Sequence, residues 1–166
     1  MTDQWPTASL GNVGRLRALT AAYKASVIVE RTIPASFDRV WEYFADMERS
    51  VPSFDETVAE FRITERIGNH LTARVRGPLL PIRFTLDVDL EPGWCIMTAR
   101  PVYYLVAFAA EPAGDQTLFA HAEACNIPGP KALRRIGAPI LTPATKWLRG
   151  HVTRDIDGLE RELEIW

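Results

Sequence analysis

The C-terminal stretch Thr142–Trp166, which reads TPATKWLRGHVTRDIDGLERELEIW, decides the fold. Its apolar residues recur at spacings of three and four, the period of one face of an α-helix, at Leu148, Val152, Ile156, Leu159, Leu163 and Trp166. Thr142 and Pro143 supply an N-cap and a first-turn proline, so we predict a helix from about Pro143 to Glu164. If nearly the whole stretch to Trp166 is helical, about 24 residues, the helix is roughly 36 Å long. With one apolar stripe, it needs a broad surface to lie on.

The middle of the chain supplies that surface as strands. Residues 82–91 alternate apolar and polar side chains, as expected of a strand with one buried face and one wet face. Other strand-like segments, separated by turns rich in Gly and Pro, cover 26–33, 58–67, 71–76, 94–100, 102–111 and 117–126. Consecutive strands joined by tight turns form a meander, and a sheet of this size curls. We therefore predict an α+β fold, with a curved antiparallel sheet of six or seven strands wrapped around the C-terminal helix.

Two short helices are predicted directly after the first strand. Residues 37–44 place apolar side chains at helical spacing, and Ser36 is the expected N-cap. Residues 47–54 form the second helical pattern, interrupted at Val51 and Pro52. Two helices inserted between the first strand and the rest of a sheet are unusual, so this arrangement helps to identify the fold.

These motifs resemble the START-like helix-grip (SRPBCC) superfamily. The resemblance rests on the segment PASFDRVWEYFADME at 34–48 with Pro52, on GDQTL at 114–118, on Pro128-Gly129 and on the C-terminal amphipathic helix. It covers roughly residues 25–165. The superfamily includes polyketide cyclase/dehydrase-like proteins, lipid and quinone carriers, and pollen-allergen-like proteins. The resemblance implies a ligand cavity between helix and sheet. It identifies no catalytic residue in this chain, because the shared motifs determine the fold and not a reaction.

Composition limits the possible functions. The chain has 166 residues, of which 47% are hydrophobic and 24% are charged, as in an ordinary globular domain. A net charge of −2 offers no field that would attract nucleic acid. Cys95 and Cys125 lack CxxC spacing, which favours reduced thiols in a cytoplasmic protein. We expect residues 1–24 to form an N-terminal arm, flexible or docked, and residues 25–166 to form the ligand-binding domain.

Strong catalytic signatures are absent from the sequence. There is no GxSxG, P-loop or HExxH motif. His70, His121 and His151 lie far apart in the chain without ligand partners at metal spacing, so we predict neither a metal nor a cofactor. The candidates for acid–base chemistry are His121, Glu123 and His151.

The phase of the last strand decides the role of two of these candidates. His121 and Glu123 stand two residues apart, so both lie on the same face of the strand. Leu118, Ala120, Ala122 and Ala124 form the other, wholly apolar face. The burial rule favours the apolar face inside, with His121 and Glu123 facing water. In the opposite phase, both would line the cavity, and desolvation would raise the pKa of Glu123.

The preferred phase predicts the residues that contact a ligand. Small side chains on inward positions leave room for a cavity, and Trp147 with His151 would cap it from the helix. The alternative for Trp147 is core packing. The predicted ligand-binding residues are Phe84, Leu86, Val88, Leu105, Ala107, Leu118, Ala120, Ala122, Trp147 and His151. Candidate anchors for an acidic group are Arg74, Arg76 and Arg100, although strand alternation turns the first two outward.

The same phase would leave Tyr104, Val106, Phe108 and Phe119 on the outer face of the sheet. Such a patch needs a cover, either the N-terminal segment or a second subunit, and we favour a homodimer.

A cationic cluster of Lys131, Arg134 and Arg135 lies near the expected cavity mouth. It is interpreted as a solvated face, with transient membrane contact as the alternative.

Two classes of function follow. The first is a carrier or sensor that binds a small hydrophobic molecule, such as a lipid, an isoprenoid quinone or a polyketide. The second is an aromatase/cyclase-type enzyme, which would need several titratable side chains on inward strand positions. The apolar inward set of the preferred phase favours binding.

Overall fold

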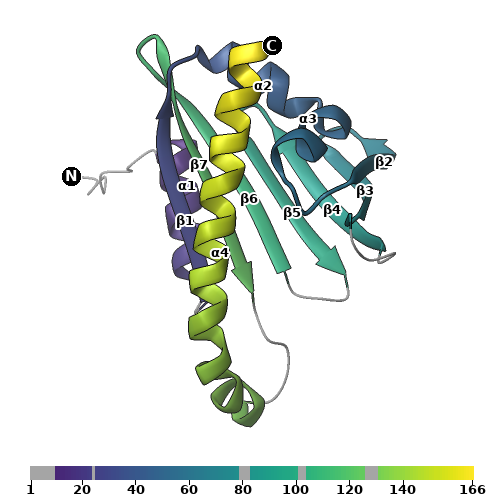
Figure 1. Cartoon of the computed structure of the whole chain (residues 1–166), viewed down its shortest axis with the longest axis vertical. Helices are drawn as coiled ribbons and strands as arrows, with labels where there is room; N and C mark the ends of the chain where they lie inside the picture. Colours follow the sequence, from purple (N-terminus) through teal and green to yellow (C-terminus); the bar gives the residue numbers. More distant parts are fainter. Residues whose placement is uncertain (1–9, 24, 79–82, 101–103, 126–130) are drawn as a thin grey trace, which may run out of the picture.

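The computed structural model describes residues 10–23, 25–78, 83–100, 104–125 and 131–166, without the side chains of Arg100 and residues 131–144. Seven strands and four helices make up this part of the chain (Figure 1). The helices are α1 (Asn12–Ala21), α2 (Phe37–Ala45), α3 (Met47–Phe54) and α4 (Lys131–Ile165). The strands are β1 (Ala25–Ile33), β2 (Glu60–Ile67), β3 (His70–Arg76), β4 (Arg83–Glu91), β5 (Trp94–Arg100), β6 (Tyr104–Ala113) and β7 (Gln116–Cys125).

The strands form one antiparallel sheet in the order β1-β7-β6-β5-β4-β3-β2. The meander from β2 to β7 closes on β1, which pairs with β7 from Ala25 opposite Cys125 to Ile33 opposite Thr117. Figure 1 shows α4 crossing one face of this curved sheet, with α2 and α3 beside it and α1 on the opposite face. The predicted helix-grip architecture is confirmed.

Helix α4 packs through the apolar stripe that the sequence predicts. Leu148, Val152, Ile156, Leu159 and Leu163 are all nearly inaccessible to solvent. The helix begins at Lys131, so the predicted start at Thr142-Pro143 is wrong. Proline inside a helix removes one hydrogen bond and crowds the carbonyl four residues earlier, which can kink a helix without ending it. No helix in the described ranges is long and apolar enough to cross a membrane.

Aromatic side chains fill the core between α2, α3 and the sheet. Ser36 caps α2 by accepting a hydrogen bond from the backbone N–H of Arg39, as predicted. The ring centroid of Phe44 lies 4.7 Å from that of Phe108 on β6 and 6.0 Å from that of Phe119 on β7. Phe108 and Phe119 therefore point toward the helices, on the inner face of the sheet.

This orientation reverses the predicted phase of β6 and β7. On the outer face, Leu105, Ala107, Ala109, Ala120, Ala122 and Ala124 form a cluster with Val13 and Leu16 of α1. Tyr104, Val106, Phe108 and Phe119 are on the inner face, so the aromatic outer patch from which a homodimer was predicted does not exist. The burial rule failed because both faces of these strands are covered, and alternation then carries no information about phase.

Helix α1 is the cover of the outer face. Val13 and Leu16 are fully buried against the alanines, whose short side chains let the helix lie close to the sheet. Arg17 Nε donates to Glu30 Oε1 on β1 at 2.6 Å, and the Arg15 guanidinium lies 4.4 Å from the Trp94 ring centroid. The described part of the N-terminal arm is thus docked on the sheet.

The contact between α3 and α4 gives a test of the fold. A Cβ added at Gly158 of α4 would lie 2.6 Å from the carbonyl oxygen of Phe54, so Gly158→Ala forces the two helices apart. We expect this substitution to lower the free energy of unfolding by about 1–3 kcal/mol, measured by urea denaturation.

Gly150→Ala is the matched control on the same helix. A Cβ there would approach only the mobile end of Arg154, at 3.4 Å. We therefore expect Gly150→Ala to raise the free energy of unfolding by up to about 1 kcal/mol through helix propensity alone. Equal stabilisation by both substitutions would contradict the close helix contact.

Candidate functional site

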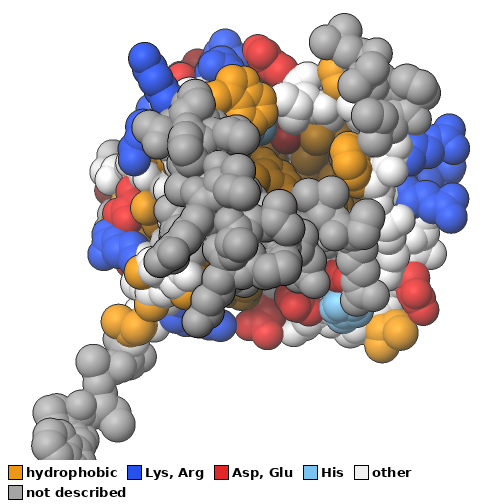
Figure 2. All heavy atoms as spheres, turned by 90° about the horizontal axis from the view of Figure 1, so that it is seen from below, with side chains coloured by type: hydrophobic (Ala, Val, Ile, Leu, Met, Phe, Trp, Pro, Cys, Tyr) orange, Lys and Arg blue, Asp and Glu red, His pale blue; other side chains and the backbone are white. Residues whose placement is uncertain are grey.

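A cavity of about 300 Å³ lies between α3, the segment that follows it, α4 and the inner face of the sheet. Its wall is mainly apolar and includes Phe54, Phe61, Leu86, Met97, Ala99, Val106 and Phe108. Asp55, Thr57, Glu123 and His151 add polar groups. Figure 2, which looks at the end of the molecule where α4 begins, shows hydrophobic side chains inside a hollow.

Three elements bring titratable side chains to this region. Strand β7 places His121 and Glu123 on its inner face, because residues two apart share a face. Helix α4 presents His151 and Asp155, one turn apart, to the same place. Asp55 follows the last residue of α3.

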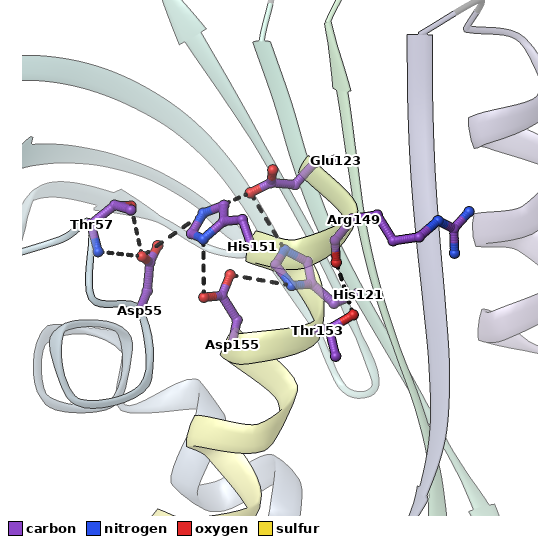
Figure 3. Close-up of polar contacts among 8 residues, drawn as sticks. All are labelled: Asp55, Thr57, His121, Glu123, Arg149, His151, Thr153 and Asp155. Atoms are coloured by element: carbon purple, nitrogen blue, oxygen red, sulfur yellow. Dashed lines mark hydrogen bonds and ion pairs between the residues drawn. The ribbon is translucent and has the colours of Figure 1, made fainter. Parts of the chain in front are cut away.

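Four of these side chains form a closed ring in which imidazoles and carboxylates alternate (Figure 3). His151 Nε2 lies 3.3 Å from Glu123 Oε1, and His151 Nδ1 lies 3.3 Å from Asp155 Oδ1. His121 completes the ring, with Nδ1 3.5 Å from Asp155 Oδ2 and Nε2 3.9 Å from Glu123 Oε1. We call these four residues the His–carboxylate ring.

Asp55 stands beside the ring and is already hydrogen-bonded. The backbone N–H and the hydroxyl of Thr57 donate to Asp55 Oδ1 at 2.8 and 2.6 Å. The same oxygen lies 3.9 Å from His151 Nε2. Asp55 therefore contributes negative charge next to His151 without belonging to the ring.

The ring is almost completely buried. The residues are 1% (His121), 1% (Glu123), 4% (His151) and 3% (Asp155) exposed. Within the described residues, the two ring nitrogens of His121 and Glu123 Oε2 make no hydrogen bond of good geometry, and the nitrogens lie 3.5 and 3.9 Å from the nearest carboxylate oxygens of the ring. The His121 ring stacks on Phe108, with centroids 4.1 Å apart and planes 18° from parallel. Buried polar atoms without partners are rare and costly, so they mark this ring as a functional candidate.

Burial and mutual charge set the protonation of the ring. Burial lowers the pKa of His121 to about 3, and the charge of His151 acts in the same direction. Burial also acts to lower the pKa of His151, but contact with Glu123 and the other nearby carboxylates outweighs it and raises the pKa to about 9. Burial, with the charge of Asp55, raises the pKa of Asp155 to about 8. One imidazole is thus neutral and the other charged at neutral pH.

Tyr104 extends the polar side of the cavity. Its ring borders the cavity from β6, and burial followed by the charge of Glu123 raises the pKa of its hydroxyl. The site therefore combines a hydroxyl donor, a carboxylate and an imidazolium at one wall of an apolar space. Such a set is able to bind, orient or protonate an oxygen atom of a ligand.

The structure divides the predicted ligand-binding residues into three groups. Phe84, Leu86 and His151 line the cavity, and their contact with a ligand stays a prediction. Val88 faces inward but is buried in the core. The predicted inward placement is wrong for Leu105, Ala107, Leu118, Ala120 and Ala122, which all lie on the outer face with α1.

Trp147 is not part of the cavity wall. Its side chain is 57% exposed, and its ring stacks on that of His151 with centroids 5.4 Å apart. The prediction that Trp147 packs in the core is therefore wrong, and its contact with a ligand stays a prediction. The indole covers the outer side of the His151 imidazole.

The basic residues considered from the sequence lie elsewhere. Arg74 is exposed, and Arg76 pairs with Glu60 through an Nε–Oε2 contact of 3.1 Å. The side chains of Arg100, Lys131, Arg134 and Arg135 lie outside the described part of the structure.

Asp55, Tyr104 and Asp155 were not predicted as site residues, and His121 and Glu123 lie on the face opposite to the predicted one. A signal for Asp155 was available, because His151 and Asp155 occupy positions within the buried stripe of α4. Polar residues at such positions indicate a buried polar site. His70 lies apart from the other two histidines: it is exposed and contacts Asp89 at 2.9 Å. His121 and His151, far apart in the sequence, come together in the ring.

Comparisons with known proteins agree on the fold. No family model matches the sequence, and no curated protein is significantly similar to it. Among solved structures, TTHA0849 from Thermus thermophilus matches with a TM-score of 0.68 and 18% identity over 84% of this chain and 97% of that one. The Zhui aromatase/cyclase from a Streptomyces species matches with a TM-score of 0.59 and 18% identity, covering 84% and 93% of the two chains.

A third match is the Polyketide_cyc-like protein Cgl2372 from Corynebacterium glutamicum, with a TM-score of 0.58 and 15% identity over 85% of this chain and 92% of that one. Identities this low establish the fold and nothing finer. The chain has the START-like helix-grip fold that its motifs resemble.

The buried imidazole of His121 gives a second test. In a buffer that contains a chelator, we expect His121→Leu to raise the free energy of unfolding by roughly 1 kcal/mol, because it removes two buried nitrogens that lack partners. Urea denaturation measures the change. His70→Leu is the control on the surface, where we expect a change within about 1 kcal/mol. Destabilisation by His121→Leu would show that the imidazole is favourably bonded.

Proposed function

We propose that this protein binds a small hydrophobic molecule in the cavity between α4 and the sheet. The observation that supports this most directly is the cavity itself. Its volume of about 300 Å³ lies at the lower end of the range of ligand pockets, roughly 300–1,000 Å³. Its wall is apolar over β4, β5 and β6, and burial of apolar ligand surface would drive binding.

The ligand we propose carries at least one oxygen atom that forms hydrogen bonds. Glu123 and His151 are neighbours on a mainly apolar wall, and Tyr104 lines the same cavity. A pure hydrocarbon would desolvate the cavity side of these groups without offering them a hydrogen bond, which is unfavourable. A polyketide, a phenol or a quinone offers both an apolar body and carbonyl or hydroxyl oxygens. The likeness in fold to proteins titled aromatase/cyclase and Polyketide_cyc-like supports this class.

Filling the cavity tests the proposal. Ala99 lies on the cavity wall, so Ala99→Phe places a ring in the space that a ligand would occupy. We expect the affinity for an apolar fluorescent probe to fall by about tenfold or more, equal to at least 1.4 kcal/mol. Fluorescence titration measures this change.

Ala18→Phe on the exposed side of α1 makes the same chemical change away from the cavity and should leave probe affinity unaltered. Circular dichroism would verify that both variants are folded. Equal affinity of folded Ala99→Phe and the native protein would contradict binding in this cavity.

A second candidate is an enzyme that transfers protons on such a molecule. The preferred strand phase put no titratable side chain on the inner face of β7, which spoke against catalysis. In the structure, His121 and Glu123 both lie on that inner face. Glu123 and His151 meet the geometric requirement for a base and an acid side by side at the cavity wall. In an aromatase/cyclase reaction, they would remove a proton next to a carbonyl and protonate the oxygen.

Product analysis separates the enzyme from the carrier. The protein would be incubated with a synthetic poly-β-ketone, and ring-closed products would be measured by liquid chromatography with mass spectrometry. An enzyme should accelerate cyclisation, and Glu123→Gln should reduce the rate by about 10²–10⁴-fold while probe affinity is retained. A product profile equal to that without protein would leave binding as the function.

A further inference from the structure

The His–carboxylate ring has unused coordinating capacity. Both nitrogens of His121 and one oxygen of Glu123 are buried without hydrogen-bond partners in the described part of the chain. In the proposed function, Glu123 and His151 contact the ligand from the cavity wall. His121 and Asp155 do not line that wall, so ligand binding gives them no role. A group bound between these residues would satisfy the atoms that make no hydrogen bond of good geometry.

We propose that one imidazole nitrogen of His121 and the carboxylates of Glu123 and Asp155 bind a divalent transition-metal ion. One donor atom from each residue lies within 4.8 Å of the others. Donors of a tetrahedral site, about 2.0–2.2 Å from the metal, are roughly 3.3–3.6 Å apart. A small inward movement of side chains would therefore complete the site.

A second group of potential ligands, Asp55, His151 and Asp155, is less suitable. Asp55 Oδ1 already accepts two short hydrogen bonds from Thr57. Asp55 is also the one member of either group that is partly exposed. The set of His121, Glu123 and Asp155 is fully buried and contains all three side-chain atoms left without partners.

The charge of the site also favours a cation. Glu123, Asp155 and the adjacent Asp55 bring three carboxyl groups together, and their ion-pair contacts in the described structure are all with His121 or His151. No lysine or arginine in that part of the chain pairs with them at close range. A divalent ion would bind these carboxyl groups in their deprotonated form and coordinate the buried atoms of His121 and Glu123.

The donor types indicate the class of metal. An imidazole nitrogen with carboxylate oxygens suits zinc, cobalt, manganese or iron(II), whereas calcium and magnesium prefer oxygen ligands alone. The surrounding residues hold the ligands in place, as metal sites require. Phe108 stacks on His121, and His151 contacts both carboxylates at 3.3 Å.

The ion would lie next to the cavity, because Glu123 belongs to both the metal site and the cavity wall. With three protein ligands, a fourth coordination position stays available to water or to an oxygen of a bound molecule. The metal proposal is independent of ligand binding, since every proposed ligand of the ion comes from the protein itself.

Cobalt(II) serves as the probe, because its visible absorption reports coordination number and geometry. The whole purified protein would be stripped with a chelator, dialysed and titrated with Co²⁺, and Zn²⁺ would then be added in competition. We expect one Co²⁺ per chain, displacement by Zn²⁺, no displacement by Mg²⁺, and a higher unfolding temperature with the metal than without it.

Three variants and one control locate the site. His121→Leu, Glu123→Gln and Asp155→Asn should each weaken Co²⁺ binding by about 100-fold or more, whereas the surface variant His70→Leu should bind as the native protein does. Circular dichroism establishes that each variant is folded, and the thermal shift of the native protein provides a test that needs no variant. Probe binding in the cavity, measured on the same samples, should persist in the stripped protein.

Two results would overturn the metal site. One is a native protein whose absorption and unfolding temperature do not respond to saturating Co²⁺ or Zn²⁺. The other is Co²⁺ binding that survives in the folded site variants or that is lost equally in His70→Leu, since the ion would then bind elsewhere. Neither result would affect the cavity proposal, which the Ala99→Phe titration tests separately.

Discussion

The packing of α4 against the inner face of the sheet is the constraint on which the rest of the structure depends. Its stripe of Leu148, Val152 and neighbouring residues buries the helix, and helical geometry then directs His151 and Asp155 toward β7. The same packing excludes water from these groups. The fold that buries the apolar stripe thereby also creates the polar site.

Burial on both faces of β6 and β7 is the second organising feature. Helix α1 lies on the alanine face, and the aromatic core with the cavity lies on the other. Alanine suits the outer face because a helix is able to approach the backbone closely there. Larger side chains, such as Phe108 and Phe119, fill the inner space near α2 and α3 and leave the cavity beyond them.

The His–carboxylate ring lowers the free energy of unfolding. Desolvated carboxylates and an imidazole without partners oppose folding, and apolar residues of similar size would pack without this cost. Natural proteins tolerate such features mainly at functional sites. Proton transfer to a ligand and coordination of a metal are two uses of the same ring, and both require groups held rigidly at the edge of an apolar cavity.

The sequence by itself determined the helix-grip fold, because the period of α4 and the strand alternation report which residues are buried locally. It also placed Phe84, Leu86 and His151 on the inner side, where they line the cavity, because they stand on elements with one clearly apolar face; their contact with a ligand stays a prediction. Only the tertiary structure decided the phase of β6 and β7, since both faces of these strands are buried and local alternation cannot distinguish them. The meeting of His121 and Glu123 with His151 and Asp155 follows from that phase. It depends on contacts between β7 and α4, and the sequence pattern of one element does not show which residues of the other it meets.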